Sequence, residues 1–275
     1  MPSVVLPYQV TKTLMLAFHE LQDSVPIINK EYLNNFTLNY KYNILSNDLP
    51  SSSPKIKYFG IGINGFKNID SENGGAPYIP KTSNLDLYEP IPFRIVPLNS
   101  DLSPEERAQY RMRVERTING LQYACYYLKV LNVLNDSVDI ITTNINTGEE
   151  SSGNSQLNSD NLYPEPSDTV LEGTVSDTYE TNVSITCEAT ITGTEVIEAV
   201  SILYGNDPNT ILKARISEIG LYAGEDKVID TQNNIKEAIY TFLGYHRTSL
   251  GTDFSDPSTT SKLKFKLSSA NSFLS

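Results

Sequence analysis

Apolar and polar residues alternate with a period of two in several stretches of the chain, a pattern typical of half-buried β-strands. Strands with this pattern, or with continuous apolar runs, are predicted at residues 36–45, 55–63, 121–134, 181–192, 211–226 and 262–267. Residues 233–246 fit a strand or a helix equally well. In the last predicted strand Lys262, Lys264 and Lys266 share one face, which is a common protection against edge-to-edge association.

Helical spacing of apolar residues predicts three helices. Residues 8–23 carry one apolar stripe and should form an amphipathic helix. Ser103 starts the second helix, because Pro104 and Glu106 follow it in the order of a capping box. We expect this helix to continue along the sequence PEERAQYRMRVER. The third helix is predicted at 194–205, capped by Thr194 and ended by Gly205.

Two polar stretches divide these elements. Asn119-Gly120 is a strong indication of a two-residue hairpin turn. Residues 144–168 are acidic and rich in Gly, Ser and Pro, which is typical of a linker or a long excursion. We therefore predict a mainly β protein with a few helices (α+β), an antiparallel β-sandwich-like core, long loops and extended arms. Its expected parts are a helix-plus-β domain at 1–145, a polar linker or excursion at 146–167 and a β-sandwich-like domain at 168–275.

The segment KYFGIGINGF contains Gly60, Gly62 and Gly65 in the G-x-G-x-x-G spacing of dinucleotide-binding enzymes. That motif needs a helix directly after the glycines, because the pyrophosphate rests on the helix N-terminus. The residues that follow here are rich in glycine and proline and cannot form such a helix. We predict instead a strand that runs into a bend, where the missing Cβ atoms allow close approach of another backbone.

Residues 84–97, NLDLYEPIPFRIVP, form an extended segment with prolines at positions 90, 92 and 97. Proline lacks the N–H group that a central strand donates, so this segment is predicted at a sheet edge or along the surface. Such a segment can lie across a neighbouring subunit with little further loss of conformational entropy.

Composition narrows the class of function. The net charge of −12 argues against a surface that neutralises nucleic-acid phosphates, and no apolar run of about 18 residues could span a membrane, so we expect neither partner. The 17 Tyr residues, the absence of Trp and the Asn-, Ser- and Thr-rich loops would provide adaptable hydrogen bonding at subunit contacts. Cys125 and Cys187 lie in apolar strands and are predicted to be buried free thiols.

Candidate catalytic chemistry is sparse. His19 and His246 are the two histidines, and the sequence has neither a G-x-S-x-G elbow nor His and Cys at metal-ligand spacing. With 33 Asp and Glu residues, the chain could contain a glycosidase-like carboxylate pair, although it lacks the Trp platforms common at sugar sites. Glu218 lies in an apolar strand, where we expect it to pair with Arg215 or a partner subunit rather than act as a general base. We predict no catalytic residue, no metal and no cofactor.

The strand ARISEIGLYAGED resembles one of the form I-x-E-I-G-L-Y that recurs in tail and baseplate proteins of tailed bacteriophages. The matching residues are Ile216, Glu218, Ile219, Gly220, Leu221 and Tyr222. The order of YFGIGING, NLDLYEPIPFRIVP, DLSPEERAQYRMR and EAIYTFLGYHRTSLGTDFSDPS before a final alternating strand is also similar to phage virion proteins. The arrangement resembles the baseplate wedge proteins of contractile-tailed phages, but its middle section is shorter, which leaves the position in the virion open.

The resemblance implies a structural, non-enzymatic protein of the virion tail, assembled in the host bacterial cytoplasm as symmetric copies in a ring. Its partners would be other tail or neck proteins and copies of itself. A neck or head–tail connector and a receptor- or carbohydrate-binding tail module are the alternatives, and an enzyme of unrecognised type is a third hypothesis.

Two sets of residues are candidates for subunit contacts. Arg107, Arg111, Arg113 and Arg116 form either a solvated helix face or a contact with an acidic neighbouring subunit. The residues that we expect at interfaces are Tyr88, Pro90, Pro92, Phe93, Arg94, Arg107, Arg111 and Glu218.

Overall fold

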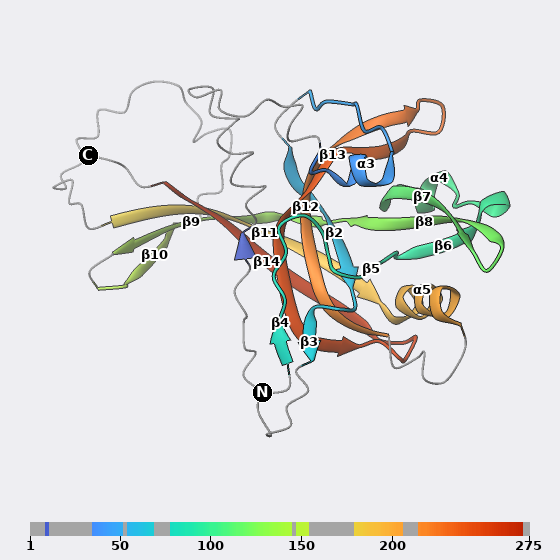
Figure 1. Ribbon diagram of the computed structural model, residues 1–275. Helices are drawn as coiled ribbons and strands as arrows, with labels where there is room; N and C mark the ends of the chain where they lie inside the picture. Colours follow the sequence, from blue (N-terminus) through green and yellow to red (C-terminus); the bar gives the residue numbers. More distant parts are fainter. Residues whose placement is uncertain are drawn as a thin grey trace. The chain divides into compact units, whose positions relative to one another are not determined.

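The computed structural model describes residues 9–10, 35–51, 54–68, 78–144, 147–153, 179–205 and 214–271 (Figure 1). Its strands are β1 (Gln9–Val10), β2 (Lys55–Gly62), β3 (Phe66–Asn68), β4 (Tyr78–Pro80), β5 (Pro90–Ile91), β6 (Arg94–Pro97), β7 (Tyr110–Ile118), β8 (Leu121–Val130), β9 (Asn132–Asn144), β10 (Glu150–Gly153), β11 (Tyr179–Thr192), β12 (Arg215–Asp230), β13 (Ile235–Asp253) and β14 (Thr260–Asn271). Its helices are α3 (Leu38–Tyr42), α4 (Pro104–Arg107), α5 (Gly193–Tyr204) and the 3₁₀ helix η1 (Leu98–Ser100). The prediction of a mainly β protein with a few helices and antiparallel sheets is confirmed.

The chain forms two compact units, each built from two separate stretches. The larger unit comprises Met1–Leu131 with Thr190–Ser261, and the smaller comprises Asn132–Ala189 with Lys262–Ser275. This division differs from the predicted consecutive domains. The physical reason is that β12 and β13, late in the sequence, pair with strands from the beginning of the chain.

The larger unit is organised around β12. Its described strands form a sheet in the order β1-β13-β12-β2-β8-β6, in which β5 also pairs with β2 and β7 with β8. β12 therefore lies between β13 and β2, and every residue from 216 to 224 is buried. Beyond residue 224 the strand is partly or fully exposed and continues with β13 as a two-stranded ribbon (Figure 1). The strand that contains the sequence ARISEIGLYAGED is thus the core strand of this unit.

The smaller unit contains a four-stranded sheet in the order β10-β9-β11-β14. β10 lies inside the segment predicted as a polar linker or excursion, so residues 150–153 are not a linker but part of a hairpin with β9. The turn before β10 explains the difference: Gly148 has a φ of 71°, and its N–H donates to the Asn144 carbonyl at 2.7 Å, which returns the chain along β9. Residues 146 and 154–167 of the predicted linker lie outside the described residues.

The predicted strand at 36–45 is wrong, because this stretch contains helix α3. Thr37 caps the helix by accepting a hydrogen bond from the Tyr40 N–H at 3.1 Å, and Asn43 ends it with a φ of 53°. Asn39 is fully buried; its side chain donates to the Ala238 carbonyl at 2.8 Å and accepts from the Thr241 N–H at 2.9 Å. These polar contacts outweigh the alternation of apolar and polar residues. Over so short a stretch, the alternation does not exclude a helix of five residues.

The helix predicted from Ser103 forms, but it ends at Arg107. The capping box is present: Ser103 Oγ accepts from the Glu106 N–H at 3.3 Å, and Glu106 Oε2 accepts from the Ser103 N–H at 3.1 Å. The following residues belong instead to β7, which pairs with β8 through the predicted Asn119-Gly120 turn. Both turn residues have positive φ, 51° and 81°, as a two-residue hairpin requires. The turn therefore overrides the helical pattern.

The remaining predictions are mostly confirmed. Strands cover 55–62, 181–192 and most of 211–226; the ambiguous 233–246 is strand from residue 235; and 121–134 divides into β8 and β9. α5 ends at Gly205 as predicted, but its capping residue is Thr192 rather than Thr194. Gln9 and Val10 are strand rather than helix, and the rest of 8–23, including His19, lies outside the described residues. Cys125 and Cys187 are buried free thiols, as predicted.

Candidate protein interface and its carboxylate anchors

Glu218 is fully buried in β12, where it binds residues 83–97, that is, Ser83 and the predicted extended segment that follows it. Its carboxylate accepts hydrogen bonds from the backbone N–H groups of Tyr88 at 3.1 Å and Glu89 at 3.0 Å. The third partner is His246 Nε2 at 3.2 Å, while His246 Nδ1 accepts from the Ser83 N–H at 3.3 Å. Because Nδ1 is an acceptor, the proton of the neutral ring is on Nε2. Glu218 pairs with His246 and not with Arg215, so the predicted Arg215 pair is wrong, while the alternative of a partner subunit stays a prediction.

The carboxyl group of Glu218 is held in its charged form. Burial raises its pKa, but the hydrogen bonds from His246, Glu89 and Tyr88 outweigh burial and lower the pKa below its ordinary value. A general base that works near neutral pH needs the opposite shift. The arrangement therefore suits a structural anchor for the 83–97 segment.

The glycine motif makes room for this anchor. A Cβ at Gly62 would lie 2.6 Å from Glu218 Oε1, and one at Gly65 would lie 2.5 Å from the Ser217 carbonyl oxygen. Gly62 faces Glu218 directly in the β2–β12 register. The spacing thus reflects close strand approach, as predicted, and β3 rather than a helix follows the glycines.

We expect Gly62→Ala to lower the free energy of unfolding by about 1–3 kcal/mol, because the added methyl group would displace the Glu218 carboxylate. Urea denaturation followed by circular dichroism measures the change. Asn64→Ala, at an exposed position two residues after the end of β2, serves as the control with an expected change below about 0.5 kcal/mol. Equal effects of the two substitutions would contradict the close approach.

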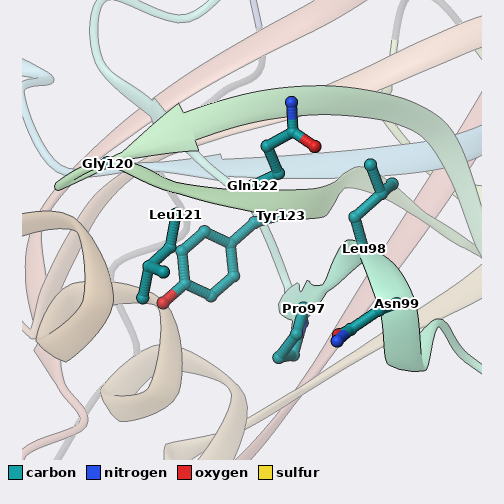
Figure 2. Close-up of a pocket in the computed structure, with 7 residues that line it drawn as sticks. All are labelled: Pro97, Leu98, Asn99, Gly120, Leu121, Gln122 and Tyr123. Carbon is teal, nitrogen blue, oxygen red and sulfur yellow. The ribbon is translucent and has the colours of Figure 1, made fainter.

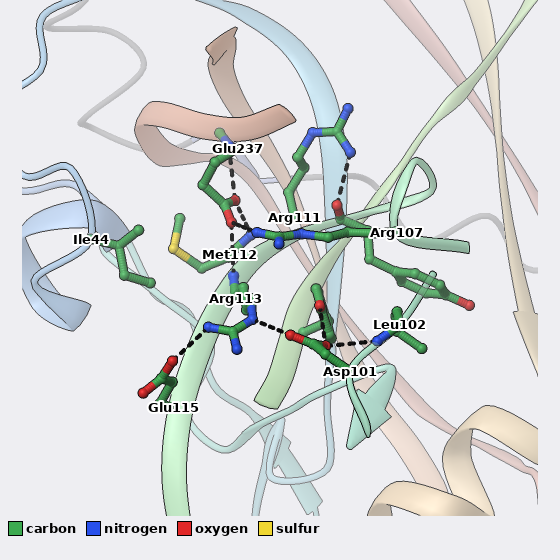
Figure 3. Close-up of polar contacts among 12 residues, drawn as sticks. Ile44, Asp101, Leu102, Arg107, Arg111, Met112, Arg113, Glu115 and Glu237 are labelled. Carbon is green, nitrogen blue, oxygen red and sulfur yellow. Dashed lines mark hydrogen bonds and ion pairs between the residues drawn. The ribbon is translucent and has the colours of Figure 1, made fainter. Parts of the chain in front are cut away.

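Two further glutamates anchor neighbouring strands in the same way. Glu237 accepts from the consecutive N–H groups of Met112 at 2.5 Å and Arg113 at 3.2 Å (Figure 3). Glu198 accepts from the Ile95 N–H at 3.1 Å and from Arg94 Nε at 3.2 Å. Carboxylates thus satisfy backbone donors that no strand covers. No sequence spacing indicated these partners.

The predicted interface residues fall into two groups. Tyr88 is exposed, and Pro90 is partly buried. The others make contacts within the chain: Pro92, Phe93 and Glu218 are buried, and Arg94, Arg107 and Arg111 form ion pairs with Glu198, Glu237 and Asp226. β6 does lie at a sheet edge, as predicted for 84–97, but most of the segment's apolar side chains point into the core.

The four arginines of the predicted helix also separate. Arg111 pairs with Asp226 at 2.6 Å. Arg113 pairs with Asp101 at 2.7 Å and with Glu115 at 2.8 Å (Figure 3). Arg107 approaches Glu237 at 3.7 Å. Arg116 is exposed and forms no ion pair with any residue that the structure describes.

Comparison with known proteins places the chain in a family. Residues 5–271 match the profile of a family of unknown function, DUF7208. The chain belongs to this family. No curated protein and no solved structure matches it. The DUF7208 match extends over both units and includes Glu218, Glu237 and Glu198 with all their backbone partners. None of the helices described for this DUF7208 member is long and apolar enough to cross a membrane.

The DUF7208 chain has a shallow hollow beside the β7–β8 turn. Its walls come from the start of β8 and from the β6–η1 junction (Figure 2). The residues that line it are Pro97, Leu98, Asn99, Gly120, Leu121, Gln122 and Tyr123. Leu121, 61% exposed, is the most exposed of the large apolar residues that the structure describes. This tip is a candidate contact surface, because an exposed apolar side chain beside a rigid turn loses little entropy on binding.

A second hollow of the DUF7208 chain, about 290 Å³ in volume, collects four tyrosines. We call it the tyrosine hollow. Its lining residues are Lys41, Tyr42, Tyr88, Glu89, Pro90, Arg116, Tyr127, Leu203 and Tyr204. It therefore combines Tyr88, the exposed member of the predicted interface set, with Arg116. Tyrosine and arginine are the residues most enriched in the centres of protein interfaces.

Proposed function

We propose that this protein is a structural component of a bacteriophage tail, in the baseplate wedge, that assembles through contacts with other proteins. The observation that carries the proposal is the position of the phage-like strand. Its six matching residues lie in the buried part of β12, where Glu218 binds the 83–97 segment and Gly220 faces Gly60 of β2. Three segments carry the resemblance, and in the folded chain they contact one another: the strand, the glycine segment and the extended segment.

The pairing of the buried ionisable groups supports a structural role. Glu195 accepts from the Tyr110 hydroxyl at 2.7 Å and pairs with Lys129 at 2.6 Å. Asp226 binds Arg111, and its pKa is lowered because the hydrogen bonds from Arg111 and Tyr58 outweigh burial, which alone would raise it. Buried side chains that bind one another in this way stabilise a fold. We therefore propose a non-enzymatic protein.

The tyrosine hollow favours one alternative, a receptor- or carbohydrate-binding tail module, because that function needs tyrosines gathered at one surface. The aromatic faces argue against a sugar. Tyr42 stacks with Tyr127 at a centroid distance of 5.3 Å, and Lys81 Nζ lies 4.8 Å from the Tyr88 ring centroid. Rings that are already engaged offer less open face to a pyranose, so we favour assembly through proteins.

Immunogold labelling of purified virions from a phage that encodes this chain tests the proposal. We expect label at the distal end of the tail, and the chain among the proteins that mass spectrometry detects in the same particles. Label at the head–tail junction would favour the neck, and label on fibres would favour a receptor-binding module. Absence of the chain from purified particles would contradict a virion role.

A further inference from the structure

The tyrosine hollow contains a buried polar group without an internal partner. Tyr127 is 4% exposed, and its hydroxyl makes no hydrogen bond with any described residue. The Tyr204 hydroxyl, by contrast, donates to Glu89 Oε1 at 2.6 Å. An unsatisfied buried hydroxyl costs about 1–3 kcal/mol, and a ligand in the hollow that accepted its hydrogen would recover that cost.

Arg116 is a charged group of the hollow that forms no ion pair with a described residue. Its guanidinium lies 5.5 Å from the centroid of the Tyr127 ring and has no ion pair among the described residues. The other cation of the hollow, Lys41, is neutralised by Asp86 at 2.5 Å. The positive charge that the hollow can offer to a ligand is therefore that of Arg116.

The rings themselves favour an anion. Because Tyr42 and Tyr127 stack on each other, and Lys41 lies 4.9 Å from the Tyr42 ring centroid, their faces are already in use. Ring edges carry partial positive charge, and phenol groups donate hydrogen bonds. Glu89 is the carboxylate on the wall, and it opposes an incoming negative charge while it accepts from Tyr204.

We propose that the tyrosine hollow binds a carboxylate on an acidic segment of a partner protein, which Arg116 and the Tyr127 hydroxyl receive. The proposal rests on the proposed function, since it names the chemistry of one assembly contact. Carboxylate fits a guanidinium and a phenol donor, and the tyrosine walls suit the chain that carries it. The sequence suggested four arginines for a contact with an acidic neighbour, and the proposal assigns this contact to Arg116.

The test measures binding of a synthetic peptide to the isolated full-length chain. The probe is an acetylated and amidated hexapeptide of alternating Glu and Ser, compared with the same peptide with Gln for Glu and with inorganic phosphate. We expect the Glu peptide to bind at one site, and the Gln peptide and phosphate to bind at least about tenfold more weakly. Failure of the Glu peptide to bind, or equal binding of phosphate, would overturn the proposal.

Four variants locate the site. Arg116→Gln and Tyr127→Phe should each weaken peptide binding by about tenfold, and Glu89→Gln should tighten it by removing the opposing charge. Lys55→Gln removes one exposed positive charge outside the hollow and should leave binding unchanged. Equal losses with Arg116→Gln and Lys55→Gln would mean unspecific attraction and would overturn the proposal.

Tyr127→Phe also separates binding from folding. Because the Tyr127 hydroxyl has no internal partner, its removal should not lower the midpoint of thermal unfolding, although it weakens binding. A lowered midpoint together with unchanged binding would overturn the assignment of this hydroxyl. The peptide assay needs no virion, so its failure would not affect the immunogold result. If the chain binds the peptide but is absent from particles, only the proposed tail function is contradicted.

Discussion

Replacement of Glu218 by alanine is expected to lower the free energy of unfolding by about 3–5 kcal/mol. The substitution removes the acceptor of three donors: the partly buried N–H groups of Tyr88 and Glu89, and the buried Nε2–H of His246. It also frees the 83–97 segment from β12. Urea denaturation followed by circular dichroism measures the change.

Glu218→Gln is expected to cost less than Glu218→Ala but more than 1 kcal/mol, because the amide keeps one acceptor oxygen yet directs two hydrogens at existing donors. Glu105→Ala, at an exposed position of α4, is the control and should change stability by less than about 0.5 kcal/mol. A Glu218→Ala protein as stable as this control would show that the anchor contributes nothing.

The same carboxylate makes stability depend on acidity. Its pKa in the folded protein is lowered, so its contribution is fully present above the ordinary glutamate pKa of about 4.3 and is lost as the pH falls through the folded value. We expect the unfolding free energy of the wild type to fall more steeply than that of Glu218→Gln below about pH 4.5. Parallel pH profiles would contradict this role.

Phe93→Ala is expected to lower the free energy of unfolding by about 3–5 kcal/mol. Phe93 is fully buried and meets Phe59 edge to face at a centroid distance of 5.1 Å. A segment that only lay across a neighbour would tolerate this change in the isolated chain. The measurement is again urea denaturation of the purified protein.

Leu85→Ser is the matched control, since Leu85 belongs to the same extended segment but is 50% exposed. Its expected effect is below about 0.5 kcal/mol. If Phe93→Ala were as mild as Leu85→Ser, the segment would not be part of the core. Because Phe93 and its neighbours in the segment are buried, deletion of the whole segment is expected to unfold the larger unit. A loss of assembly after this deletion would therefore not show that the segment contacts a partner.

Local features of the sequence predicted local structure well. The Asn119-Gly120 turn, the capping box at Ser103 and the end of α5 at Gly205 all depend on residues a few positions apart. Errors arose where two local patterns competed. The helical pattern after Ser103 was misleading beyond Arg107. Residues 110–118 form a hairpin with β8 instead, and this pairing satisfies their backbone hydrogen-bonding groups.

The anchors could not be predicted, because their partners meet only through the sheet. Ser83 and His246 are 163 residues apart, and Tyr88 and Glu218 are 130 apart. The sequence marked Glu218 as unusual, since a carboxylate in an apolar strand needs a partner. Which partner it meets is decided by the register of β12 with β2 and β13, and no spacing encodes that register.

The late position of β12 and β13 has a consequence for synthesis on the ribosome. β2 and the 83–97 segment are made first, but the strand and the carboxylates that cover them arrive more than 100 residues later. Closing such distant contacts is slow, and the nascent chain meanwhile exposes apolar β-strands. Ribosome-bound fragments that end before residue 215 should therefore stay sensitive to protease and recruit chaperones, whereas fragments that extend past residue 253 should become resistant.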